Sequence, residues 1–194
     1  MPPFSFITVV SGLPRSGTSV MMQMLHAGGL PAVTDRIRAA DDDNPRGYFE
    51  FERVKQIKAD KTWLPDAVGK VVKMVHMLLY DLPPDHEYRV IFMRRNLEEV
   101  VASQRVMLQR QGKQGAAIRD AQLIRIFDDQ VAKVLKWLDA QPNFRTLQVV
   151  YPELIADPRG NAQRIDEFLG GGLAIDAMAA AVDPKLYRNR RSTP

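Results

Sequence analysis

The sequence predicts an α/β fold of three layers, with helices on both faces of a mostly parallel sheet of about four to five strands. Short apolar runs rich in β-branched residues alternate with longer amphipathic segments, which is the pattern of strands joined by crossover helices. The chain of 194 residues is long enough for one well-buried core. Its 45% hydrophobic and 26% charged residues are typical of a globular protein. We therefore expect a single domain over residues 1–194.

The first predicted unit is a strand, a tight loop and a helix. Residues 4–10 are apolar and β-branched and end at Ser-Gly, which indicates a buried strand. Residues 18–27 favour a helix that stops at two glycines. Residues 30–69 contain no strong strand, only an acidic turn and an amphipathic piece at 51–60. Because so long a connection is usually functional, we expect an insertion at 30–69 that helps to form a substrate site.

The remaining elements continue the alternation. Strands are expected at 69–77, 88–93 and 145–150, and helices at 96–110, 116–140 and 158–169. Asn96 is the expected N-cap of its helix, with Glu99 as its partner in a capping box. Ligands of parallel sheets bind at the carboxyl ends of the strands, so the residues just after each strand are of most interest. These are Arg15, Lys73, His76, Arg94, Arg95 and Tyr151.

Charge and cysteine content narrow the classes of function. A formal net charge of +4 favours anionic ligands, but Lys and Arg are scattered except near the C-terminal end, so nucleic acid is not an expected partner. The absence of cysteine excludes disulfides, thiol nucleophiles and thiolate metal sites, and fits a reducing compartment. No signal peptide or apolar run of membrane-spanning length is evident, so we expect a cytoplasmic enzyme without a transmembrane segment. The oligomeric state is left open.

The loop after the first strand predicts an anion site. Gly12 and Gly17 fit the pattern G-x-x-x-x-G-K-[ST], but Thr18 occupies the position of the lysine. The glycines allow the loop amides to turn toward a ligand, and the following helix presents a positive N-terminus. Without the lysine, a kinase or ATPase is disfavoured, because that ammonium contacts the terminal phosphates. Arg15 supplies a cation instead.

This loop, PRSGTS at residues 14–19, resembles the 5′-phosphosulfate loop of sulfotransferases that use 3′-phosphoadenosine 5′-phosphosulfate (PAPS), which reads P-[KR]-[ST]-G-T-[ST]. The resemblance implies a fold like that of P-loop nucleoside triphosphate hydrolases and PAPS as cofactor. It also implies a catalytic role for Arg15, which in that family contacts the bridging oxygen and the sulfuryl group. The implied cofactor-binding residues of the loop are Pro14, Arg15, Ser16, Gly17, Thr18 and Ser19.

A second motif supports the same family. In FMRRNLEEVVASQ, Arg95 ends a strand and Ser103 follows eight residues later, which is similar to the family's 3′-phosphate element. A guanidinium and a hydroxyl together suit a terminal phosphate. The alternative is that both residues only flank a strand and fill a helix surface. The segment from Tyr151 also resembles the family pattern Y-x-x-L-x-x-D-P … I-x-x-F-L-G, which implies a structural role, so the resemblance covers roughly residues 6–170.

Sulfuryl transfer needs in-line placement, a base for the acceptor, and stabilisation of charge on the leaving phosphate. No metal is required if arginines and a helix terminus provide the stabilisation. Glu50 lies in NPRGYFE, which is similar to the glutamate-bearing loop of bacterial relatives, and is the favoured base, with Lys73 as a charge-stabilising neighbour. His76 is the second candidate, one place further from Lys73 than in the Lys-Thr-His element of cytosolic relatives. Glu50 could instead be an ion-pair or capping residue, and His76 a structural histidine.

The expected function is transfer of a sulfuryl group from PAPS to a hydroxyl or amine of a small-molecule, glycan or lipid acceptor. One alternative is a P-loop nucleoside or nucleotide kinase, disfavoured by Thr18 and by the lack of a convincing Walker B strand with aspartate. The other is a non-catalytic nucleotide-binding protein. The basic segment 186–191 could cover the nucleotide, but its motif does not match, and a solvated tail is the favoured interpretation.

Overall fold

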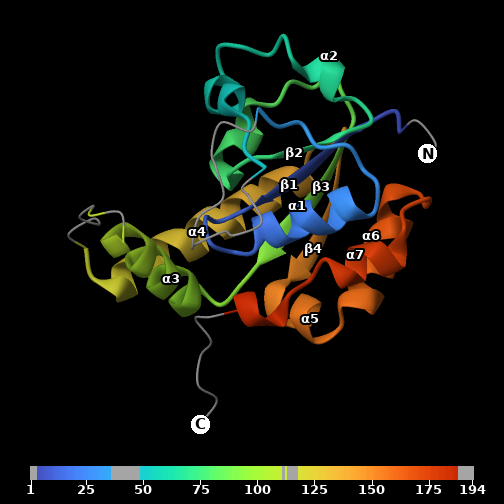
Figure 1. The fold of residues 1–194 in the computed structure, drawn as a ribbon. Coiled ribbons are helices and arrows are strands. Elements are labelled where there is room, and N and C mark those ends of the chain that lie inside the picture. Colours follow the sequence, from blue (N-terminus) through green and yellow to red (C-terminus); the bar gives the residue numbers. More distant parts are fainter. Residues whose placement is uncertain (1–3, 36–48, 111, 113–117, 188–194) are drawn as a thin grey trace.

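The computed structural model describes residues 4–35, 49–110, 112 and 118–187 (Figure 1). Strands and helices alternate along the chain, as predicted. The elements in order are β1 (Ile7–Gly12), α1 (Thr18–Ala27), η1 (Glu52–Gln56), α2 (Leu64–Ala67), β2 (Val71–Lys73), η2 (His76–Asp81), β3 (Tyr88–Arg94), α3 (Leu97–Arg110), α4 (Asp120–Asp139), β4 (Phe144–Val150), α5 (Tyr151–Ala156), α6 (Pro158–Leu169), α7 (Ile175–Ala180) and η3 (Pro184–Leu186), where η marks a 3₁₀-helix.

The strands form one sheet in the order β2-β1-β3-β4, and every neighbouring pair is parallel. Strand β2 lies on one side of β1, and β3 lies on the other side. The direction in which successive strands are added therefore reverses between β1 and β3. In doubly wound α/β folds, ligands bind at this reversal, beyond the carboxyl ends of the strands. The predicted α/β class with a parallel sheet is confirmed, and the loop after β1 lies at the place where a ligand is expected.

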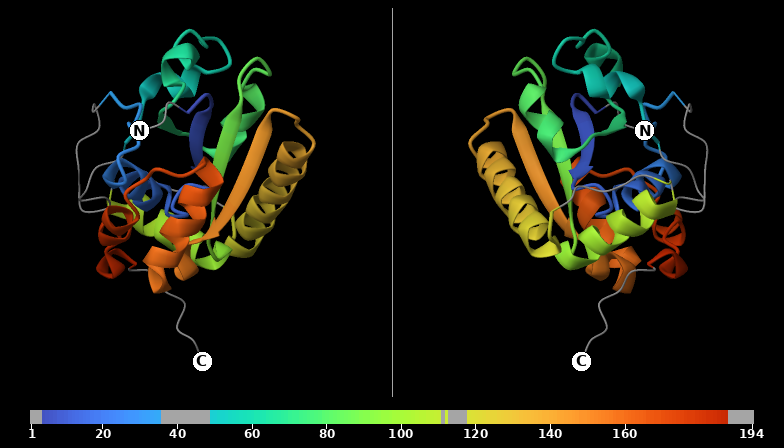
Figure 2. Two further views of the ribbon diagram at one scale, coloured as in Figure 1. Left: turned by 90° about the vertical axis from the view of Figure 1, so that its right-hand side faces the viewer. Right: turned by 90° about the vertical axis from the view of Figure 1, so that its left-hand side faces the viewer.

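Helices cover both faces of the sheet because side chains of each strand alternate between two apolar cores. Val10 belongs to the core under α1, α6 and α7, and Val9 to the core under α2, α3 and α4. Figure 2 shows α4 along one face of the sheet and α1, α6 and α7 on the other. Parallel sheets require this double cover, since both of their faces are apolar.

The second predicted strand, 69–77, is wrong in its extent. The observed β2 ends at Lys73, and His76 already begins η2. The last bond to the neighbouring strand runs from the Met74 amide to the Val10 carbonyl, at 3.1 Å. Since β1 turns into its loop after Gly12, the chain beyond Met74 loses its pairing partner, and the apolar run continues as a 3₁₀-helix.

The predicted N-cap of α3 is observed, and a second side chain caps α6. Asn96 Oδ1 accepts hydrogen bonds from the amides of Glu98 and Glu99, at 2.9 and 3.2 Å, and α3 begins at the next residue, Leu97. Asp157 accepts from the Gly160 amide at 2.9 Å and starts α6. In the ranges that the structure describes, no helix is both long and apolar enough to cross a membrane.

Candidate active site

The loop between β1 and α1 has an unusual backbone. Arg15 has φ of 70°, a left-handed conformation that is costly for a residue with a side chain. The hydroxyl of Ser16 is buried and donates to the Leu13 carbonyl at 2.7 Å, which closes the turn. Gly12, at φ of 145°, lies so close to β3 that a Cβ there would come within 2.7 Å of the Met93 carbonyl oxygen. The loop is therefore held in one shape by its own bonds and by the sheet.

Gly17 joins this loop to α1 and rests on an aromatic ring. It has φ of 101°, and an added Cβ would lie 2.4 Å from Cδ2 of Tyr151, the first residue of α5. As the N-cap of α1, Gly17 has no side chain with which to satisfy the first amides of the helix. These amides lack acceptors within the helix and, with the positive end of the helix dipole, suit an anion. Thr18 and Ser19 add hydroxyl groups in the same turn.

The structure brings the two predicted phosphate-binding motifs together. Arg15 Nε donates to Ser103 Oγ on α3 at 3.0 Å. Arg95 Nη1, from the end of β3, donates to the Arg15 carbonyl at 3.1 Å. Residues that are 80 and 88 positions apart in the chain thus contact each other at the edge of the sheet. The loop, Arg95 and Ser103 form one continuous polar site.

Arg95 lies in a buried cluster of aromatic and acidic side chains. Its Nε donates to Glu99 Oε2 at 2.9 Å, and the two side chains are only 8% and 7% exposed. The rings of Tyr151 and Tyr187 each lie 5.1 Å from its guanidinium carbon. The Tyr187 hydroxyl donates to the Glu99 carboxylate at 2.9 Å. Burial and this hydrogen bond both raise the pKa of Tyr187, so its proton stays in place at neutral pH.

Glu50 and Lys73 lie at the carboxyl end of β2. Glu50 Oε1 is 3.7 Å from Lys73 Nζ, and Lys73 Nζ is 3.4 Å from Ser19 Oγ on α1. The carbonyl of Glu50 accepts from Thr34 Oγ1 at 3.0 Å. Thr34 directly follows residues that pair with the outer edge of β2, so this bond ties Glu50 to the sheet. Residues 44–48 of the glutamate-bearing motif lie outside the described residues.

His76 is buried between the backbone of Gly12 and helix α4. It is 4% exposed and its Nε2 lies 3.1 Å from Gln130 Oε1 on α4. Burial lowers the pKa of His76, although the hydrogen bond with Gln130 and the nearby backbone of Gly12 oppose that effect. The two residues predicted as alternative bases are therefore not in equivalent positions: Glu50 borders the pocket described next, and His76 does not.

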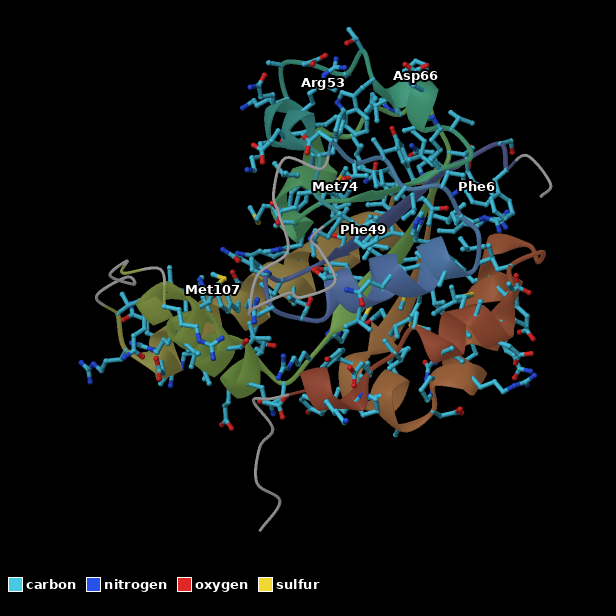
Figure 3. The ribbon with its side chains drawn as sticks, viewed as in Figure 1. Phe6, Phe49, Arg53, Asp66, Met74 and Met107 are labelled. Atoms are coloured by element: carbon cyan, nitrogen blue, oxygen red, sulfur yellow. The ribbon has the colours of Figure 1, made fainter. Side chains whose placement is uncertain are left out.

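A pocket of about 300 Å³ lies beside the loop. In Figure 3, Met74 and Phe49 lie between helix α1 and the layer of η1 and α2, marked by Arg53 and Asp66. The polar lining of this pocket includes Thr18, Glu50 and Lys73. The full lining is Gly12, Leu13, Pro14, Thr18, Glu50, Phe51, Val54, Lys55, Lys73, Met74, Val75 and Leu78. Among the described residues, no group of three or more His, Cys, Asp or Glu side chains could hold a metal ion.

The family model of the sulfotransferase domain matches residues 7–193. The chain belongs to the sulfotransferase family. No curated protein matches this sulfotransferase in sequence. Among solved structures, its fold is similar to "Sulfotransferase Domain from the Curacin Biosynthetic Pathway", with a TM-score of 0.53 and 13% identity over 98% of this chain and 93% of that chain. It is also similar to retinol dehydratase "in complex with androsterone and inactive cofactor PAP", with a TM-score of 0.54 and 16% identity over 97% of this chain and 66% of that chain.

Three residues at the site of this sulfotransferase were not predicted as site residues. The sequence marks Tyr151 as a residue of interest just after the fourth strand, but its motif implies only a structural role. Glu99 was interpreted only as a partner for the helix cap, and its contact with Arg95 at i, i+4 was the available signal. Tyr187 lies 88 residues from Glu99, and nothing in the local sequence links the two.

Proposed function

We propose that this sulfotransferase moves a sulfuryl group from PAPS to a hydroxyl or amine acceptor. The observation that carries the proposal is the direct contact of the 14–19 loop with Arg95 and Ser103. In this proposal the loop amides and hydroxyls hold the 5′ end of the nucleotide, and Arg95 and Ser103 hold its 3′-phosphate. A guanidinium with several donors and a nearby hydroxyl suit a terminal phosphate. The protein of similar fold that is described with PAP gives independent support.

In the proposed reaction, the donor supplies an activated sulfuryl group: the acceptor oxygen bonds to sulfur while the bond from sulfur to the 5′-phosphate oxygen breaks and leaves its electron pair on the phosphate. The Glu50 carboxylate takes the proton of the acceptor hydroxyl. Arg15 and the first amides of α1 stabilise the negative charge that grows on the phosphate. Lys73, between Glu50 and Ser19, adds a positive charge on the same side.

Glu50 is proposed as the base because it borders the pocket next to the loop, together with Thr18 and Lys73. His76 is proposed to be structural, since it is buried against Gln130 and does not border the pocket. The test is Glu50→Gln, for which we expect kcat to fall by about 100-fold or more while PAP binding is unchanged. Glu167→Gln is the matched control, because Glu167 is exposed on α6 and is not among the pocket residues. Equal activity of both variants and the wild type would remove Glu50 from the mechanism.

The proposed function itself is tested by two measurements on the full chain. Adenosine 3′,5′-bisphosphate (PAP) at about 100 times its Kd should stabilise the protein by roughly 2.7 kcal/mol, whereas ATP with magnesium should give a smaller effect. Incubation with PAPS and an acceptor library should add a sulfonate to some acceptor, detected by mass spectrometry. A magnesium-dependent preference for ATP would support the alternative of a kinase, and PAP binding without any transfer would indicate a binding protein.

The cytoplasmic location stays a prediction.

A further inference from the structure

Apart from Lys55, the pocket residues outside the loop and the pair Glu50 and Lys73 form an apolar wall. Phe51 and Val54 contribute from η1 and the residue before it, and Met74, Val75 and Leu78 from the chain after β2. The ring of Phe51 packs edge-on against Trp63, with 5.3 Å between the ring centres, so this side of the pocket is anchored to a second core. The apolar wall is thus part of the folded structure.

The charges around the pocket are mutually compensated. Glu50 and Lys73 lie on the loop side and face each other at 3.7 Å. Lys55 lies on the wall, but its ammonium is 2.7 Å from Glu52 and its side chain is 64% exposed. No surplus of positive charge is directed into the space by the described residues. These described residues therefore give a polyanionic acceptor, such as an acidic glycan, little electrostatic attraction.

The volume limits the size of a bound molecule. At about 30 Å³ per water molecule, a pocket of about 300 Å³ holds roughly ten waters, or an organic molecule of about ten to fifteen non-hydrogen atoms. This is the lower end of the range for small-molecule sites. The pocket shares Gly12, Leu13, Pro14 and Thr18 with the loop, so a molecule inside it lies next to the proposed sulfuryl group.

Resting on the proposed function, we propose that the acceptor is a small apolar molecule with a single hydroxyl, a phenol or a compact aliphatic alcohol. Its hydrocarbon body contacts Phe51, Val54 and Met74, and its hydroxyl faces Glu50. A sugar of the same size would press several hydroxyls against these walls, where they would lose their hydrogen bonds to water without gaining new ones. The pocket therefore selects against sugars.

The first test compares acceptors of similar size on the wild-type chain. With PAPS as donor, kcat/KM for 2-naphthol should exceed that for glucose by roughly 100-fold or more, because several sugar hydroxyls would stay unpaired. In the presence of PAP, calorimetric titration should detect binding of 2-naphthol and none of the sugar. Equal or better use of the sugar would overturn the proposal.

The second test places a charge on the wall without disturbing the core. Val75 borders the pocket and is 42% exposed, and Val68 is 39% exposed but does not border it. Val75→Asp should raise the KM for 2-naphthol by about ten-fold, since a carboxylate in the wall disfavours an apolar ligand. Val68→Asp makes the same change at nearly the same exposure and should leave KM unchanged. Equal KM values in the two variants would contradict the assignment of this pocket.

The outcomes separate this proposal from the function on which it rests. If PAP binds and a sugar or an acidic acceptor is sulfated while 2-naphthol is not, the acceptor class is wrong and sulfuryl transfer from PAPS stands. If PAP does not bind and no acceptor is sulfated, both are wrong. If 2-naphthol is sulfated but Val75→Asp acts like Val68→Asp, the apolar acceptor class is retained and the pocket is not its site.

Discussion

The substitution Gly17→Ala tests the packing that holds the phosphate-binding loop in place. Gly17 adopts φ of 101°, which costs an alanine about 1 kcal/mol or somewhat more. The new methyl carbon would also lie 2.4 Å from the ring of Tyr151, which is only 3% exposed and cannot move into solvent. Forcing such a group into a packed site costs about 2 kcal/mol. We expect a total loss of about 3 kcal/mol in the free energy of unfolding.

Gly171→Ala is the matched control for this prediction. Gly171 has φ of 87°, but no atom lies within 4 Å of the position of an added Cβ, so only the conformational cost applies. For a chain of this size, 1 kcal/mol shifts Tm by about 2–4 °C. Gly17→Ala should therefore melt roughly 4–8 °C below Gly171→Ala, and it alone should weaken PAP binding. Equal melting temperatures would refute the contact between the loop and Tyr151.

Two further predictions concern His76 and Tyr187. Because burial lowers the folded-state pKa of His76 below its usual value of 6.5, the unfolded chain binds more protons at acidic pH. The stability that His76 contributes is present above pH 6.5 and is lost as the pH falls through the folded pKa. Between pH 7.5 and 5.5, the melting temperature should therefore fall less for His76→Gln than for the wild type. Tyr187→Phe removes the hydroxyl that donates to Glu99, the carboxylate that accepts from Arg95. Because this loosens the contacts that orient Arg95, titration calorimetry should show PAP binding several-fold weaker and AMP binding unchanged. An unchanged PAP affinity would exclude this role of Tyr187.

Much of the fold could be predicted because local and tertiary signals agree. The alternation of apolar strands and amphipathic helices, the cap at Asn96 and the glycine signals all act within a few residues. The length of β2 could not be predicted, because it depends on where β1 leaves the sheet and not on the apolar run itself. Short apolar runs are compatible with a strand and with a 3₁₀-helix, and only the neighbouring strand decides between them.

The candidate site was predictable where one short motif carries the chemistry. The loop at 14–19 and the pair Arg95 and Ser103 resemble short motifs of the family, and the structure brings them into contact. Their role in phosphate binding stays a prediction. The choice between Glu50 and His76 could not be made from spacing, since it depends on which side chain borders the pocket. The cluster of Glu99 and Tyr187 around Arg95 depends on contacts across 88 residues, which no local pattern contains.

The central claim is that the loop and the pair Arg95 and Ser103 hold two phosphates of one nucleotide. Titration calorimetry of PAP and AMP against the wild type and Ser103→Ala tests it most directly, because the two ligands differ only in the 3′-phosphate. We predict that PAP binds the wild type far more tightly than AMP does. Ser103→Ala should weaken PAP binding by roughly ten-fold, as expected for one hydrogen bond to a charged group, and leave AMP binding unchanged. Equal affinities of PAP and AMP for the wild type would contradict the account.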